Sequence, residues 1–77
     1  MNKQNRKELQ GYVDSLDEIK CAIEQMQCDE EEKFDNLPEG IQDSERGEEF
    51  QEAIENLESS ASSIEEAIDY LNEILEG

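Results

Sequence analysis

Apolar residues recur at alternating intervals of three and four along two stretches of this chain, and this spacing constrains the fold more than any other feature. The second stretch is unbroken and consists of Phe50, Ile54, Leu57, Ala61, Ile64, Ile68, Leu71 and Leu75. The first stretch consists of Leu9, Tyr12, Leu16, Ile19, Ile23 and Met26. Such heptad spacing is typical of helices that pack along one narrow seam. The pattern predicts two long helices.

The first heptad series is interrupted after Met26. Glu30 and Lys33 stand where the next apolar residues would fall, and the next large apolar residue is Phe34. A charged side chain is a poor occupant of a packed seam. We therefore expect the seam to weaken or to change register between Met26 and Phe34.

Pro38 separates the two helical stretches. Proline cannot continue a helix and disfavours helical backbone in the residue before it, so the first helix is expected over about residues 4–36. Ser44 is a favourable N-cap residue. We therefore expect a structured linker over about residues 37–43 and a second helix over about 44–76.

The chain is expected to form a single domain over residues 1–77. The linker is too short to return the chain for parallel packing, so the helices should run antiparallel. A chain of this length buries little apolar surface, and a second copy would add to it. The sequence predicts an all-α antiparallel helical hairpin, coiled-coil-like, that dimerises through its a/d faces into a four-helix bundle. The expected hairpin or dimer seam comprises Leu9, Leu16, Ile19, Ile23, Met26, Phe50, Ile54, Leu57, Ile64, Ile68, Leu71 and Leu75.

The chain is strongly acidic, with 23 acidic and 6 basic residues and a formal net charge of −17. Such a surface repels nucleic acid and anionic membranes, and it attracts basic proteins. No apolar run is long enough for a membrane span or a secretion signal. We expect a cytoplasmic protein that binds a basic-surfaced protein and has no direct nucleic-acid or membrane partner.

No residue pattern points to catalysis, a cofactor or a metal. The chain has no histidine and no glycine-rich phosphate loop. Cys21 and Cys28 are seven residues apart, about 10 Å along a helix, which is too far for a disulfide within that helix. A calcium loop starting at Asp35 would place Leu37 where an oxygen ligand is required. The expectation is a protein that is not an enzyme, with no catalytic, cofactor-binding or metal-binding residues.

The second helix carries the functional hypothesis, because residues 47–77 contain ten acidic residues and no base. Residues 8–77 carry roughly 20 net negative charges, because they include all the acidic residues and leave out three N-terminal bases. Over about 50 Å of hairpin this is one charge per about 2.5 Å, against about 1.7 Å for duplex DNA, and a dimer would match or exceed the DNA value. This density is compatible with nucleic-acid mimicry, or with charge that serves solubility alone. The expected protein-binding residues are Glu39, Arg46, Glu48, Glu52, Glu55, Glu66 and Asp69.

The linker leaves two interpretations open. Pro38 and Gly40 supply turn geometry, and Leu37 and Ile41 are apolar enough to close the open end of the hairpin. Arg46 fits a salt bridge within the hairpin or a contact with a partner. A third interpretation of the whole chain is an adaptor whose seam is completed by a helix of another protein.

The segment FDNLPEGIQDSERGEEFQEAIENL, residues 34–57, resembles an element of small acidic helical proteins encoded by phages and prophages of Gram-positive bacteria. In that group an LPEG-x-Q-x-SERG linker joins two heptad-rich helices. The matching residues are Leu37, Pro38, Glu39, Gly40, Gln42, Ser44, Glu45, Arg46 and Gly47. The resemblance implies a phage origin and the cytoplasm of a bacterial host.

Small acidic phage proteins often inhibit host nucleases, defence complexes or other nucleic-acid-binding proteins, and this analogy sets the functional expectation. The chain is expected to bind and inhibit a host defence or nucleic-acid-binding protein, by mimicry of nucleic acid. The alternative is a self-assembling structural or assembly accessory bundle.

Overall fold

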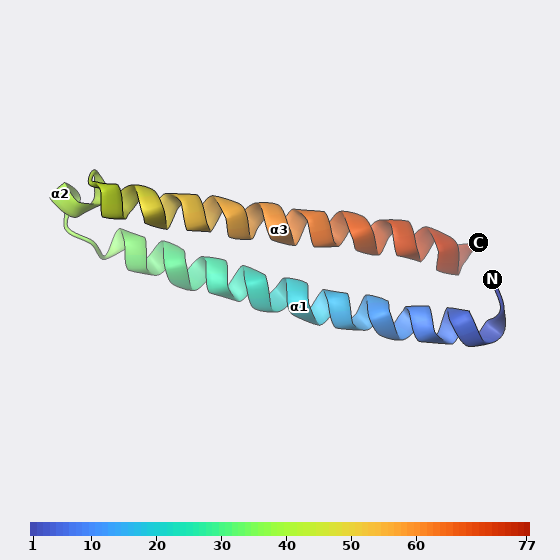
Figure 1. Ribbon diagram of the computed structural model, residues 1–77. Coiled ribbons are helices and arrows are strands. Elements are labelled where there is room, and N and C mark those ends of the chain that lie inside the picture. Colours follow the sequence, from blue (N-terminus) through green and yellow to red (C-terminus); the bar gives the residue numbers. More distant parts are fainter.

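The computed structural model describes all 77 residues, as two long helices joined by a short helical turn (Figure 1). Helix α1 spans Lys3–Asp35, α2 spans Glu39–Gln42 and α3 spans Glu45–Glu76. Helices α1 and α3 lie side by side in opposite directions, with both termini at one end and α2 at the other. The all-α antiparallel hairpin predicted from the heptad spacing is confirmed.

The α1 seam lies in a different register from the predicted one. Its inward residues are Arg6, Leu9, Val13, Leu16, Lys20, Ile23, Gln27, Glu30, Phe34 and, just beyond the helix, Leu37. Val13 is 6% exposed, whereas Tyr12, Ile19 and Met26 are 61%, 50% and 54% exposed. Ile19 and Met26, expected on a hairpin or dimer seam, therefore lie beside the hairpin seam.

The α1 seam keeps one register beyond Met26, although the residues that continue it there, Gln27 and Glu30, are polar. Val13, Gln27 and Phe34 belong to one seven-residue series that continues without a break to the end of the helix. The series includes Lys20, whose side chain is only 18% exposed. A lysine can cover apolar surface with its aliphatic stem while its amino group stays near water. Polar residues thus occupy the seam without breaking its register.

The α3 seam follows the eight apolar residues at three-four spacing. All eight are buried or half-buried. Ala61 and Ile68 lie deepest, at 7% and 9% exposure, and with Val13 they are the only buried hydrophobic residues. No side chain is fully buried. The core is therefore a thin seam between α1 and α3.

Two polar contacts between α1 and α3 mark their antiparallel alignment. At the open end, Arg6 Nη1 donates a hydrogen bond to the Leu75 carbonyl oxygen at 2.9 Å. In the middle, Lys20 Nζ lies 3.9 Å from Glu65 Oε1. The N-terminal bases form no ion pair with acids at the end of α3; Arg6 instead pairs with one of the last carbonyls of α3, which has no partner within its own helix.

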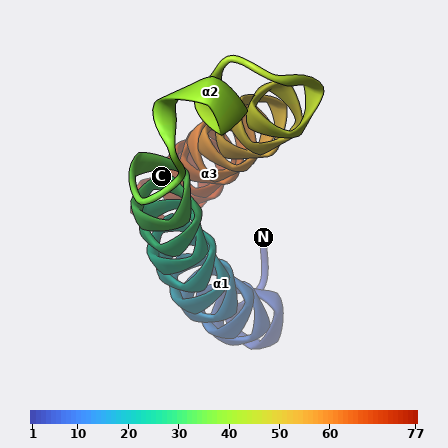
Figure 2. The same ribbon diagram turned by 90° about the vertical axis from the view of Figure 1, so that its left-hand side faces the viewer.

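The linker packs as a tight corner between the near ends of α1 and α3 (Figure 2). Gln42 Nε2 donates to the carbonyl oxygens of Phe34, Asp35 and Leu37, at 3.0, 3.4 and 3.1 Å. Two of these bonds satisfy the carbonyl groups of Asp35, at the end of α1, and Leu37, just beyond it, whereas the Phe34 carbonyl also accepts from the Leu37 backbone N–H. Gly47 is buried, and a Cβ atom there would overlap the Gln42 carbonyl group. Close backbone approach at this position requires glycine.

Ser44 begins α3 as its N-cap residue, in extended conformation, as the sequence predicts. Its hydroxyl does not accept a bond from the backbone of α3; it donates to the Ile41 carbonyl oxygen instead. Leu37 is half-buried, and Ile41 is 36% exposed. Leu37 therefore covers the closed end of the hairpin better than Ile41 does.

Candidate functional site

The outward face of α3 carries a line of exposed carboxylates that we call the acidic stripe. Its members are Glu48, Glu52, Glu55, Glu66, Asp69, Glu73 and Glu76. They follow three-four spacing, with Ser59 and Ser62 at the two positions between Glu55 and Glu66. Residues at this spacing share one helix face, and this face lies opposite the buried seam of α3. The acidic stripe therefore extends along the whole helix.

No base neutralises the acidic stripe. The molecule has three side-chain ion pairs, between Lys20 and Asp17, Lys20 and Glu65, and Lys33 and Glu30. None of them includes a residue of the acidic stripe. Like charges three or four residues apart destabilise a helix by a few tenths of a kcal/mol per pair. The stripe thus carries an electrostatic cost that nothing within the chain offsets.

The predicted protein-binding residues fall into two groups. Glu48, Glu52, Glu55, Glu66 and Asp69 all belong to the acidic stripe. The other two, Glu39 on α2 and Arg46 in the first turn of α3, are exposed but lie outside it.

The sequence-based selection omitted Glu73 and Glu76. The same three-four spacing, continued beyond Asp69, identifies both residues. The spacing that identifies Glu73 and Glu76 was therefore present in the sequence, but it defines an exposed surface only once the inward face of α3 is known.

The outward face of α1 is less acidic. It carries Asp14, Glu18, Glu32 and Asp35, interspersed with Gln25 and the two cysteines. Cys21 and Cys28 are free and exposed. This contrast makes the outward face of α1 a natural control surface for experiments on the acidic stripe.

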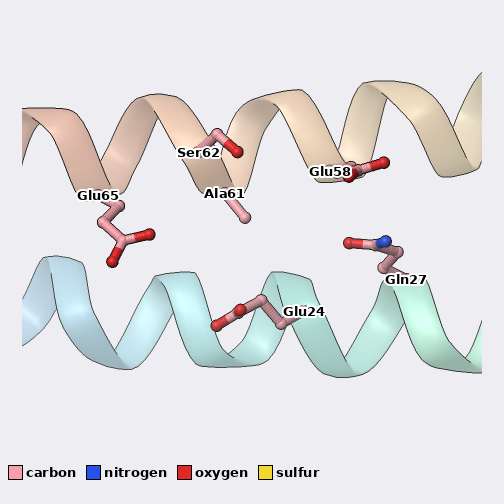
Figure 3. Close-up of a pocket in the computed structure, with 6 residues that line it drawn as sticks. All are labelled: Glu24, Gln27, Glu58, Ala61, Ser62 and Glu65. Atoms are coloured by element: carbon pink, nitrogen blue, oxygen red, sulfur yellow. The ribbon is translucent and has the colours of Figure 1, made fainter.

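A second group of carboxylates lines a hollow of about 280 Å³ on one side of the hairpin (Figure 3). Glu24 and Gln27 come from α1, and Glu58, Ala61, Ser62 and Glu65 come from α3. The small side chain of Ala61 leaves the space between the helices open. The carboxylates do not converge into a group that could hold a metal ion. This hollow extends the negative surface from α3 towards α1.

The opposite side of the hairpin has fewer acidic residues, which are matched by bases, and we call it the neutral face. Each heptad of α1 and α3 has two inward residues, and the neutral face consists of the residue directly before the first of them. These residues are Asn5, Tyr12, Ile19, Met26, Lys33, Arg46, Ala53, Ser60, Ala67 and Ile74. Met26 of α1 and Ala53 and Ser60 of α3 line one shared hollow of about 510 Å³, which places the two series on the same side. None of the ten is acidic, although 23 of the 77 residues are. Glu30 and Glu49 also line hollows on this side. Lys33 pairs with Glu30, and Arg46 lines the same hollow as Glu49. Two carboxylates and two bases balance, so this side carries little net charge.

Comparisons of the chain with protein-family models, curated protein sequences and solved structures give no match. None of the three helices combines the length and the apolar character needed to cross a membrane.

Proposed function

We propose that this chain is a non-enzymatic binding protein that occupies the basic surface of a nucleic-acid-binding protein and blocks it. The acidic stripe would make the contact. The observation that carries the proposal is the absence of any base along a stripe of seven exposed carboxylates. Contact with a basic surface would supply the missing opposite charge and offset the repulsion within α3.

The charge density supports mimicry of a single nucleic-acid strand by one hairpin. The hairpin is 58 Å long and carries a net charge of −17, which corresponds to one charge per about 3.4 Å. Each strand of DNA carries one charge per about 3.4 Å of helix axis, and the duplex one per about 1.7 Å. The sequence-based value of one charge per about 2.5 Å was too dense, because it used a shorter hairpin and left out the N-terminal bases.

The linker resemblance to phage and prophage proteins suggests the setting of this binding. By that analogy, the target would be a defence protein or another nucleic-acid-binding protein in the cytoplasm of a bacterial host. An inhibitor that occupies a nucleic-acid site acts stoichiometrically and needs no catalytic residue.

The alternative proposal is a self-assembling structural or assembly accessory bundle whose charge confers solubility. The neutral face favours it, since a side with little net charge is what contact between identical acidic chains requires. The two proposals differ in the role of the acidic stripe, because only the inhibitor needs that stripe for its function.

The test is affinity capture from a bacterial lysate on the immobilised protein, with elution by a salt gradient in the presence and absence of duplex DNA. We expect a basic protein that elutes as salt rises and that duplex DNA displaces, because counterions and DNA compete for the same surface. A column that retains nothing except the chain itself would contradict the inhibitor and favour the accessory bundle.

A matched pair of variants separates the acidic stripe from general charge. Replacing Glu52, Glu55 and Glu66 by Gln removes three carboxylates from the stripe. Replacing Asp14 by Asn, and Glu18 and Glu32 by Gln, removes three from the outward face of α1. We expect about tenfold weaker target binding for the stripe variant only, since three exposed ion pairs are worth about 0.5 kcal/mol each. An equal loss in both variants would contradict a site on α3.

A further inference from the structure

We propose that a second copy of this chain covers the neutral face, in antiparallel orientation. Helix α1 of one copy would pack on α1 of the other, and α3 on α3, with the loop end of each hairpin over the open end of its partner. The result is a four-helix bundle in which every pair of neighbouring helices is antiparallel. The inference rests on the neutral face and is independent of the function of the acidic stripe.

The hairpin has too little core of its own. Val13, Ala61 and Ile68 are its only buried hydrophobic residues, and none of its side chains is fully buried. Four of the inward residues of α1 are polar: Arg6, Lys20, Gln27 and Glu30. Small domains with so thin a seam commonly gain stability by association. The a/d faces already contact each other within the hairpin, so a dimer needs a different surface.

The neutral face has the size and the shape for this association. One whole side of the hairpin measures 58 by 14 Å between Cα atoms, an outline of about 800 Å², which is comparable to the area that each partner buries in a standard protein interface. Tyr12, Ile19 and Met26 are at least half exposed on it. Ala53, Ser60 and Ala67 are small, and they allow two α3 helices to approach closely.

The charge distribution identifies the occupant as a second copy. Two chains with a net charge of −17 each repel one another unless their contact surfaces carry little net charge. The neutral face meets this condition, because none of its ten positions is acidic and the neighbouring Glu30 and Glu49 are matched by Lys33 and Arg46. A basic partner would instead be drawn to the acidic stripe and to the hollow around Glu24, Glu58 and Glu65.

The basic residues at the loop end fix the orientation. Arg46 forms no ion pair within the hairpin, and Lys33 pairs only with Glu30. A parallel dimer would place α1 over α3 at the same end, and so set Lys33 of each copy beside Arg46 of the other. Antiparallel packing instead brings Arg46 over the partner's Ile74, in the last turns of α3, and so keeps it away from the partner's Lys33.

The antiparallel dimer would also change the charge density. Two overlapping hairpins carry twice the charge of −17 along the same 58 Å, or one charge per about 1.7 Å. This value equals that of duplex DNA. The association thus gives the rod the charge spacing of a double helix.

Sedimentation equilibrium tests the association. The wild-type chain of 8.9 kDa should sediment as a species of about twice that mass. Glutamate substitutions at Ile19 and Ala67 on the neutral face should weaken self-association about a hundredfold, because each leaves a carboxylate in the contact. The same substitutions at the exposed Cys21 and Ser62, which lie off that face, should leave the dimer intact. A monomeric wild type, or a dimer that survives the neutral-face substitutions, would overturn the proposal.

Cross-linking provides a second test that does not depend on a destabilising substitution. The variant for this test carries Ser60→Cys in a chain with Cys21 and Cys28 replaced by serine. Ser60 lies near the middle of α3 on the neutral face. In the antiparallel dimer alone, the two α3 helices meet and bring both copies of position 60 together. A short bismaleimide should give a covalent dimer with Ser60→Cys and not with Ser62→Cys. Equal cross-linking of both variants, or of neither, would overturn the arrangement.

Discussion

Gly47 shows how one residue determines the geometry of the corner. The end of α2 passes so close to α3 that a Cβ atom at position 47 would overlap the Gln42 carbonyl oxygen and lie 2.8 Å from the Ile41 carbonyl oxygen. Both are backbone atoms, so relief would require α2 to move. We expect Gly47→Ala to lower the free energy of unfolding by about 1–3 kcal/mol. Urea denaturation followed by circular dichroism measures this loss.

Gly11→Ala is the control for this substitution. Gly11 lies within α1, and a Cβ atom there would meet nothing within 4 Å. Alanine should therefore stabilise the helix by about 0.5–1 kcal/mol, because glycine loses more backbone entropy on folding. If Gly47→Ala were as stable as Gly11→Ala, the tight corner described here would be wrong.

Gln42 joins the linker to the end of α1. Its amide nitrogen donates to three carbonyl groups, those of Phe34, Asp35 and Leu37. We expect Gln42→Ala to cost about 1–2 kcal/mol, because the carbonyl groups of Asp35 and Leu37 then have no donor, while that of Phe34 keeps the Leu37 backbone N–H. Gln25→Ala should cost little, since Gln25 is exposed and bonds only to Asp29 on its own helix. Amide hydrogen exchange should show faster opening in the last turn of α1 for the Gln42 variant only.

At the scale of the helices, the register of α1 is where sequence and structure differ. Two heptad registers share Leu9, Leu16 and Ile23. Between these residues, the predicted register places Ile19 inward, whereas the observed register places the next residue, Lys20, inward. Apolar residues alone favour Ile19 over Lys20. The structure adopts the register that continues unbroken to Phe34, with the aliphatic stem of Lys20 covering the seam. A preference based on side-chain polarity could not reveal this.

The helices themselves and the corner between them were within reach of the sequence. Unbroken spacing predicts α3, and Pro38 and Ser44 predict the corner. The neutral face was not predicted, because its recognition depends on the α1 register. With Ile19 and Met26 placed on the seam, the side of the hairpin that carries little net charge cannot be recognised. The correct register sets them beside the seam, in line with Ala53 and Ala67.

The observed register leads to a prediction about stability. Gln27 occupies an inward position of α1 and, with Ala61, lines the hollow shown in Figure 3. Gln27→Leu should raise the free energy of unfolding by about 1 kcal/mol, because it places apolar surface in the seam. The control is Gln25→Leu, at an exposed position, which should change stability little. Equal effects in urea denaturation would contradict the observed register.

At the scale of the whole molecule, the rod presents different surfaces along its length. The acidic stripe lies on the outward face of α3, and the neutral face lies on one side of the hairpin. Because these surfaces do not coincide, a dimer formed through the neutral face would leave the acidic stripe of each copy free. Self-association and binding of a basic protein are therefore compatible in one molecule.

The net charge also determines how the molecule responds to salt. With a charge of −17 and only three side-chain ion pairs, repulsion between carboxylates outweighs attraction. Salt screens exposed charges, with a Debye length of about 30 Å at 0.01 M and about 8 Å at 0.15 M. We expect the melting temperature to rise with sodium chloride over this range, at fixed protein concentration. Replacing Glu52, Glu55 and Glu66 by Gln should raise it at low salt and reduce its salt dependence, because part of the repulsion is then absent. A melting temperature that falls as salt increases would mean that ion pairs, and not the apolar seam, hold α1 and α3 together.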